Sequence, residues 1–203
     1  MRYEKGHKDT THKHVVEVAS KHFRKHGIEG ASIKDLMGNA GLTHGGFYSH
    51  FASKQQLLQQ ALTQAFTETR AAFSKAGESD GIEGVIRQYL GQSHRDKAER
   101  GCAFAALTQE IARQDKRTRT ILADELEAYI DVIASHISGT DKNAGQTKAL
   151  QIFSLMIGAL QLARAVPDAD HSDHILKSAG EAVRLLSSPE KSTNERGRDA
   201  DAV

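Results

Sequence analysis

The sequence predicts an all-α protein of about nine helices, with an amino-terminal three-helix domain followed by a larger helical domain. Apolar residues repeat at helical spacing along most of the chain. The 203 residues include only two prolines and no tryptophan. A chain of this length has room for one medium domain, or for a small domain fused to a larger one.

Two short helices joined by a glycine turn are expected between residues 32 and 51, after a longer helix over 10–26. Ser32 is placed to cap the first of the two, and Gly41 ends it. Thr43 is expected to cap the second helix. That helix buries two aromatic residues one turn apart, Phe47 and Phe51.

Six further helices are expected in the rest of the chain. Ser53 and Gln56 form a capping box that begins the first of them, which is expected to end at the glycine-containing stretch 76–81. The tail 188–203 is polar and is expected to be disordered. The other five helices are expected at 82–90, after Gly101, and at about 116–137, 146–166 and 172–186.

Positive charge gathers near the amino terminus. Residues 1–54 carry nine Lys and Arg against five Asp and Glu, together with seven of the eleven histidines, although the whole chain has a net charge of only +1. Phosphate binding requires such a gathering of charge. An ordinary solvated basic face gives the same pattern. The basic residues Arg2, Lys5 and Lys8 are candidates for a DNA-contacting arm.

The cellular setting is read from the cysteine count and the amino terminus. Cys102 is the single cysteine, which excludes an internal disulfide framework and fits a reducing cytoplasm. The first residues are polar and show no signal peptide, and the most apolar run, 149–163, is too short to span a bilayer. We expect a soluble cytoplasmic protein that does not bind membranes.

The second short helix carries the chemistry that indicates a function. Gly45 and Gly46 lie inside it, where each glycine costs about 1 kcal/mol relative to alanine. Their use is steric, because a helix turn without side chains can approach a phosphate or a groove wall closely, and the free amides of its amino end favour anions. We expect this helix to enter the major groove of DNA. Its contacting residues are expected to be Thr43, His44, Gly45, Gly46, Tyr48, Ser49, His50 and Lys54.

The order Phe47-Tyr48-x-His50-Phe51-x-Ser53-Lys54, after Gly41-Leu42-Thr43, resembles the signature of the TetR/AcrR family of transcriptional regulators. The resemblance covers residues 10–60. It implies groove-facing positions at Thr43, His44 and Gly45, and phosphate-contacting positions at Ser32, Tyr48, His50 and Lys54. Ser32 and Thr43 have an alternative role as helix caps alone. The chain departs from the family pattern at Ala31 and Gly46.

The resemblance also implies an architecture and a mode of action. It implies a homodimer with a DNA-binding helix-turn-helix domain over 1–54 and a ligand-binding and dimerisation domain over 55–187. The implied function is that of a repressor, released from a double-stranded DNA operator by a small-molecule effector. The expected dimer contact lies at about residues 146–187, because the helix over 146–166 is apolar almost all the way round. A central core helix is the alternative explanation.

The sequence indicates the residues of the effector site less clearly than those of the DNA-binding domain. Four residues are candidates for lining an apolar cavity, although they serve equally well as plain core: Phe104, Tyr129, Phe153 and Met156. Cys102 is a further candidate, either as a small buried residue or as a thiol that senses electrophiles or oxidants, with Arg100 expected to lower its pKa. Thiol sensing on the same scaffold is therefore the alternative function.

Other functional classes have weaker support. No nucleophile elbow, phosphate-binding glycine loop or HExxH zinc motif is present, so an enzyme is not expected. A DNA-packaging protein that binds without sequence preference remains the third class. Acidic and histidine residues crowd positions 168–174, but we interpret them as caps of the last helix and expect neither a metal nor a cofactor.

Overall fold

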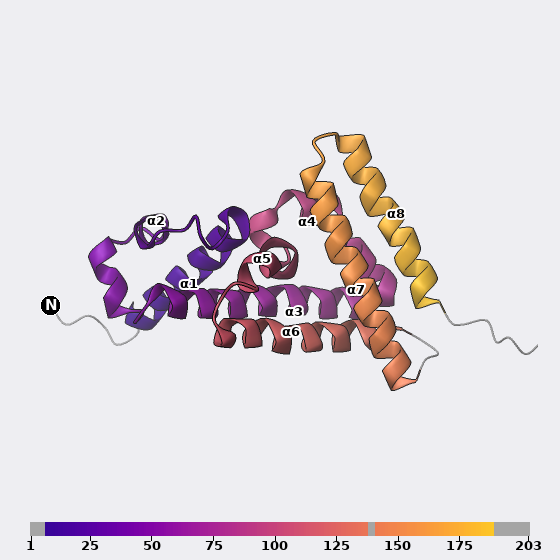
Figure 1. Cartoon of the computed structure of the whole chain (residues 1–203), viewed down its shortest axis with the longest axis horizontal. Coiled ribbons are helices and arrows are strands. Elements are labelled where there is room, and N and C mark those ends of the chain that lie inside the picture. Colours follow the sequence, from indigo (N-terminus) through magenta and orange to yellow (C-terminus); the bar gives the residue numbers. More distant parts are fainter. Residues whose placement is uncertain (1–6, 138–140, 189–203) are drawn as a thin grey trace, which may run out of the picture.

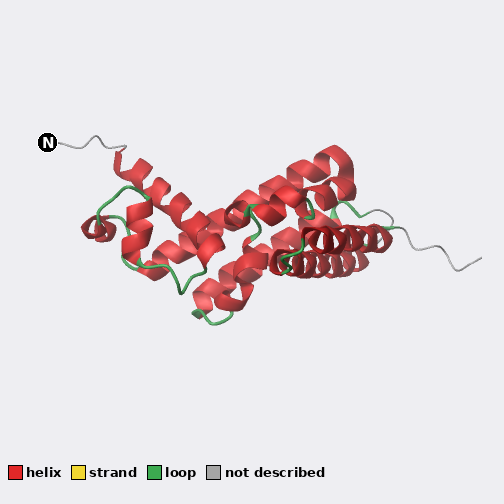
Figure 2. Cartoon of the chain, turned by 90° about the horizontal axis from the view of Figure 1, so that it is seen from above, coloured by secondary structure: helices red, strands yellow, loops and turns green. Residues whose placement is uncertain are grey.

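The computed structural model describes residues 7–137 and 141–188, and within these ranges it contains helices and loops only (Figure 2). The expected tail lies almost entirely outside the described residues. The all-helical class is confirmed. In chain order the elements are α1 (His7–His26), α2 (Ile33–Asn39), the 3₁₀ helix η1 (His44–Ser49), α3 (Lys54–Tyr89), α4 (Gln92–Asp96), the 3₁₀ helix η2 (Ala98–Arg100), α5 (Ala103–Ile111), α6 (Lys116–Ala134), α7 (Lys142–Ala165) and α8 (Ala169–Ser187).

The molecule is elongated, with different elements at its two ends (Figure 1). At one end α1, α2 and η1 surround the beginning of α3, and we call this group the amino-terminal bundle. At the other end α7 and α8 pack against each other as a helical hairpin. The long helix α3 runs between them, with α6 alongside it. None of the described helices has the length and apolar character that a membrane span requires.

The expected interruption at 76–81 is present, at Asp80 and Gly81. Helix α3 continues to Tyr89 through a kink, where Asp80 (φ −139°) and Gly81 (φ +56°) leave the helical conformation. The glycine at 77 has a packing role instead, because a Cβ there would lie 2.0 Å from Nε2 of His136 on α6. Gly77 therefore brings α3 and α6 close together, while the kink at Asp80 and Gly81 separates the two helical segments of α3.

Most of the buried side chains form one continuous core that runs through both ends of the molecule. Phe47 and Phe51 are buried as expected, at 0% and 1% exposure. Farther along, the hydroxyl of Tyr129 donates to the carbonyl of Phe66 at 2.9 Å, which joins α6 to α3 in the interior. The amino-terminal bundle is thus packed on the same core as the rest of the chain.

Two polar side chains, Arg24 and Glu110, fix the carboxy-terminal end of α1 to α3 and to the α5 region. The guanidinium of Arg24, 4% exposed, donates to the carbonyl of Gly101 at 3.1 Å and to Glu68 at 3.0 Å. The carboxylate of Glu110 accepts a hydrogen bond from the backbone amide of Ile28 at 2.7 Å. We call these contacts the α1 anchor. They set the position of the amino-terminal bundle on the larger part of the chain.

Replacement by alanine should affect stability differently at Gly27, which borders the α1 anchor, and at Gly38, which does not. Gly27 has φ +81°, and a Cβ there would lie 2.8 Å from the Glu110 carboxylate. Gly27→Ala should therefore lower the free energy of unfolding by about 1–2 kcal/mol. Gly38 in α2 has open space around it, so Gly38→Ala should be neutral or stabilising by up to about 1 kcal/mol. Chemical denaturation of both variants checks this, and equal effects would contradict it.

Candidate nucleic-acid interface

The turn between α2 and η1 is built as the sequence predicts at Ser32 and Gly41. The Ser32 hydroxyl accepts from the backbone amide of Asp35 at 3.1 Å and caps α2. Gly41 adopts φ +70°, and the amide of Leu42 reaches back to the carbonyl of Met37 at 2.9 Å. This bond pattern closes the carboxy-terminal end of a helix around a left-handed glycine. The turn fixes the direction in which η1 leaves α2.

The second short helix differs from the expectation in two respects. It is a 3₁₀ helix rather than an α-helix, and Thr43 makes no side-chain capping bond to it. The backbone carbonyl of Thr43 instead accepts from the amide of Gly46 at 3.0 Å. η1 is six residues long, and 3₁₀ turns are frequent in short connecting segments. The exposed hydroxyl of Thr43 is therefore not used in a cap.

Steric contacts within the chain do not explain why glycine occupies positions 45 and 46 of η1. A Cβ on Gly45 would meet no atom within 4 Å. On Gly46 it would meet only the Thr43 hydroxyl at 3.7 Å and a Met37 methyl at 3.8 Å, which are ordinary contacts. Neither glycine has a positive φ. No contact within the described chain therefore requires glycine at these two positions.

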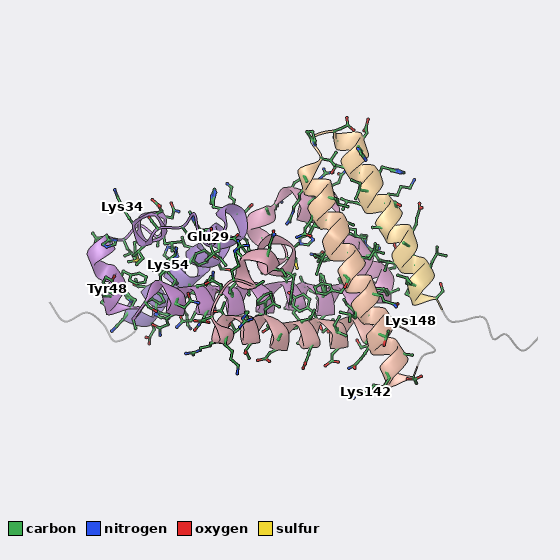
Figure 3. The ribbon with its side chains drawn as sticks, in the orientation of Figure 1. Glu29, Lys34, Tyr48, Lys54, Lys142 and Lys148 are labelled. Atoms are coloured by element: carbon green, nitrogen blue, oxygen red, sulfur yellow. The ribbon has the colours of Figure 1, made fainter. Side chains whose placement is uncertain are left out.

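The solvent-facing side of η1 is polar apart from one aromatic ring. Thr43, His44, Gly45 and Ser49 are exposed, and Tyr48 is 66% exposed with its ring edge-on to Phe47. Tyr48 lies at the end of the molecule opposite α8, together with Lys34 of α2 (Figure 3). Lys34 was not among the expected contacts, although its exposure and charge suit a phosphate. Position 34 could be found from the sequence because it lies opposite the apolar stripe of α2.

His50 and Lys54 are turned partly inward. His50 is half-buried, and its ring centre lies 6.4 Å from that of His12 on α1. The ammonium of Lys54 donates to the carbonyl of Ile28 at 3.1 Å and so ties the start of α3 to the α1–α2 turn. The structure therefore gives Lys54 a bracing role that the sequence did not indicate. Both residues lie behind the exposed row of η1.

The expected effector residues are brought together as a packed cluster. Cys102, Phe104, Tyr129, Phe153 and Met156 are each no more than 2% exposed. The rings of Phe104, Tyr129 and Phe153 have centres 5.1–5.3 Å apart. Three further Phe and Tyr rings belong to the same cluster and were not expected there, Phe66, Phe73 and Tyr89. The cluster is an aromatic core around a buried thiol.

The expected lowering of the Cys102 pKa by Arg100 is wrong in this conformation. Burial raises the pKa of the Cys102 thiol, and the cation that opposes this shift is Arg164 rather than Arg100. The neighbouring His94 is held neutral, because burial lowers its pKa to about 4. Its Nε2 accepts from the Cys102 amide at 2.9 Å, and its Nδ1 donates to the carbonyl of Tyr89 at 2.6 Å. A protonated, enclosed thiol is a poor nucleophile.

The acidic cluster before the last helix is used structurally. Asp168 accepts from the amide of His171 at 2.7 Å and caps α8. Asp173 accepts from the guanidinium of Arg95 at 2.5 Å. Throughout residues 7–137 and 141–188, no group of three or more His, Cys, Asp or Glu side chains has the arrangement of a metal site.

Three leucines of the α7–α8 hairpin are exposed. Leu162 on α7 is 60% exposed and Leu185 on α8 is 79% exposed, with Leu150 at 47%. Between the two leucines of α7, Gly158 has open space where a side chain would be. A partner helix can approach such a surface closely.

Comparison with known proteins identifies the domain that carries η1. Residues 15–61 match the model of the bacterial regulatory proteins of the tetR family. The chain has the TetR-family DNA-binding domain and the TetR-family fold. The TetR-like match spans α1, α2, η1 and the start of α3, which together form the amino-terminal bundle.

Individual relatives agree with this assignment. The HTH-type transcriptional repressor DhaR of Mycobacterium sp. (strain GP1) is 24% identical over 119 residues, which are 58% of this chain and 60% of DhaR. The chain spans between 38% and 60% of the length of the curated relatives that it matches. The similarity in sequence is therefore confined to part of each protein.

Solved structures extend the likeness in fold to most of the chain. Escherichia coli NemR in its reduced form superimposes with a TM-score of 0.74 at 18% identity, covering 87% of this chain and 96% of NemR. A TetR-family regulator from Cytophaga hutchinsonii gives a TM-score of 0.74 at 16% identity, covering 91% and 98%. At these identities the likeness concerns the fold alone.

Because Cys102 is enclosed, its thiol should be alkylated slowly in the folded protein. N-ethylmaleimide should label native Cys102 at least about a hundredfold more slowly than an exposed cysteine, because opening of the core must come first. Ala123 is exposed on α6, so Ala123→Cys provides the fast reference in the same chain. Mass spectrometry of timed samples measures both rates. Equal labelling of the two sites would contradict the buried, protonated thiol.

Proposed function

We propose that the protein is a sequence-specific DNA-binding transcriptional repressor that a small-molecule effector releases from its operator. The observation that carries the proposal is the exposed turn of η1 with its two glycines, for which nothing inside the chain gives a reason. Helix amino ends supply free amides and positive potential to phosphates. Thr43, His44 and Gly45 are assigned to the major groove, and Ser32, Tyr48 and Lys34 to the phosphates on either side of it.

Two copies are needed for a specific operator. A helix-turn-helix dimer reads two half-sites about one helical turn, roughly 34–36 Å, apart. We assign the dimer contact to the α7–α8 hairpin, at about residues 146–187, because Leu162 and Leu185 are exposed there. This places the contact at the opposite end of each chain from η1 (Figure 1). The description of DhaR as a repressor supports repression rather than activation.

A thiol sensor is the second candidate for how the repressor is released. Cys102 directly follows Gly101, whose carbonyl accepts from Arg24 in the α1 anchor. A group attached to the thiol would displace this segment and so disturb the anchor. The raised pKa of the thiol opposes the proposal at rest, and a reversible opening of the core would have to come before modification.

DNA selection tests the proposal against binding without sequence preference. Random duplexes are selected with the purified protein, and affinities for the recovered site and for a scrambled site are compared over a range of salt concentrations. A repressor should prefer its own site by about a thousandfold or more at physiological salt. Equal affinities for both duplexes, with the same salt dependence, would favour a DNA-packaging protein instead.

Gly45→Ala should separate stability from DNA binding. The added methyl has free space in the protein, so the free energy of unfolding should stay the same or rise by about 0.5–1 kcal/mol. Affinity for the selected operator should fall about tenfold or more, which is 1.4 kcal/mol. Fluorescence anisotropy and chemical denaturation measure the two effects. Unchanged affinity would remove the reason given for the glycine.

Leu162→Glu tests the assigned dimer contact. A charge on this exposed apolar side chain should disfavour burial against a partner helix and convert a dimer to monomers at micromolar concentration. Size-exclusion chromatography with light scattering gives the mass. Ala123→Glu, on the exposed side of α6, is the matched control and should leave the dimer intact. A dimer that tolerates Leu162→Glu but not Ala123→Glu would place the contact on another face.

A further inference from the structure

The corner between α1 and α2 is held from two sides at one residue, Ile28. Its backbone amide donates to Oε2 of Glu110 on α5 at 2.7 Å, and its carbonyl accepts from the ammonium of Lys54 at 3.1 Å. The amide of Glu29 donates to the same Glu110 oxygen at 3.2 Å. Ile28 itself is 4% exposed. We call this arrangement the Ile28 clamp, because two side chains of opposite charge hold one short backbone segment.

A glycine lets the Glu110 carboxylate come close to this corner. Gly27, directly after α1, has φ +81°, and a Cβ there would lie 2.8 Å from Oε1 of Glu110. Glycine adopts such a φ without strain and leaves room for the carboxylate. The bonds from Glu110 end on backbone amides, so they fix the path of the chain rather than the rotamer of another side chain.

The two sides of the clamp belong to different parts of the molecule. Lys54 begins α3 shortly after η1 and lies within the tetR-family match, whereas Glu110 on α5 lies outside it. Helix α2 packs on α1, and η1 packs on α2. Glu29 lies on the side of the amino-terminal bundle that faces α5, and Tyr48 lies at the far end of the bundle (Figure 3). The clamp is therefore a joint between the larger part of the chain and the unit that carries η1.

A small change of angle at this joint moves η1 by a distance that matters on DNA. His50, directly after η1, lies beside His12 of α1, with ring centres 6.4 Å apart. From His12 to the clamp the length of α1 is about 24 Å, at 1.5 Å per residue. Tilting an arm of this length by about 8° moves its far end by about 3.4 Å, which is the rise of one base pair.

We propose that Glu110 is a positioning residue that sets the half-site spacing of the operator, acting through the Ile28 clamp rather than by contact with DNA. It fixes the angle at which the amino-terminal bundle leaves the larger part of the chain. The exposed residues of η1 read the bases within each half-site, whereas Glu110 determines how far apart the two half-sites lie. The proposal rests on the proposed function, because spacing has a meaning only for two copies on one operator.

Operators that differ only in the length of the spacer test the proposal. Four duplexes are titrated with the full-length protein by fluorescence anisotropy: the selected operator, versions with one base pair more or less between the half-sites, and a single half-site. Glu110→Ala removes the acceptor, and because Glu110 is half-buried and alanine favours helix, α5 should keep its form. Glu110→Gln keeps a carbonyl oxygen that can accept from both amides. Glu127→Ala, which removes an exposed carboxylate of α6, is the matched control.

The wild type should bind the two altered spacings about tenfold or more weakly than the selected one. In Glu110→Ala this difference should fall to about threefold or less, because the bundle can tilt to follow either spacer. Glu110→Gln should keep most of the wild-type difference, and Glu127→Ala should keep all of it. The four proteins should bind the single half-site equally, because the residues that read bases are unchanged.

Three results would overturn the proposal. The first is a Glu110→Ala protein that discriminates between spacings as the wild type does. The second is a Glu110→Ala protein that loses as much affinity for the single half-site as for the operator, because the residue would then act on folding alone. The third is equal loss of discrimination in Glu110→Ala and Glu110→Gln. A wild type that prefers no DNA sequence, or that binds all spacings equally, would instead contradict the proposed function, so the two failures are distinguishable.

Discussion

The placement of the amino-terminal bundle depends on the buried guanidinium of Arg24. Its partners are the carbonyl of Gly101, 77 residues away in the sequence, and the carboxylate of Glu68. A buried cation is tolerated only when it is paired and hydrogen-bonded, and removing one partner of such a group is costly. Glu110 completes the attachment by accepting from the backbone amides of Ile28 and Glu29. The end of α1 therefore cannot leave the α5 region without exposing or orphaning these groups.

This attachment links the two ends of the molecule. The segment that receives Arg24 is also held by α7, since the guanidinium of Arg164 donates to the carbonyls of His94 and Arg95 at 2.7 Å and 3.1 Å. A chain of polar contacts thus runs from the α7–α8 hairpin through α4 to α1. In the proposed repressor, the hairpin sets the separation of two copies and the anchor sets the direction of each η1. A change at either place alters the geometry that two half-sites require.

The local features of the DNA-binding domain were predictable from the sequence because each depends on neighbouring residues. Ser32 and Ser53 cap the helices that follow them, and Phe47 and Phe51 are buried one turn apart. The 3₁₀ form of η1 was not predictable, because capping residues and one apolar pair look alike in a short α-helix and a 3₁₀ helix. Lys34 was not predicted, because an exposed lysine on a short helix looks the same in sequence as an ordinary solvated charge.

Long-range contacts account for the remaining differences. The break at 76–81 was predictable because the cost of a glycine in a helix is local, and it lies at Asp80 and Gly81. The packing of Gly77 against His136 was not predictable, because it joins positions 59 residues apart and is invisible to a local pattern. In the same way, a single cysteine beside Arg100 suggested an activated thiol. Only the fold shows that the chain encloses Cys102 and turns a different arginine toward it.

Contact between DNA and the amino-terminal turn of η1 is best tested by amide hydrogen exchange. The first amides of a helix have no partner within that helix and exchange freely unless something outside the chain accepts from them. Exchange of the full-length protein is followed by mass spectrometry with and without the selected operator. Peptides covering residues 43–50 should become strongly protected on DNA binding. Unchanged exchange across 43–50, with protection elsewhere in the chain, would contradict this contact.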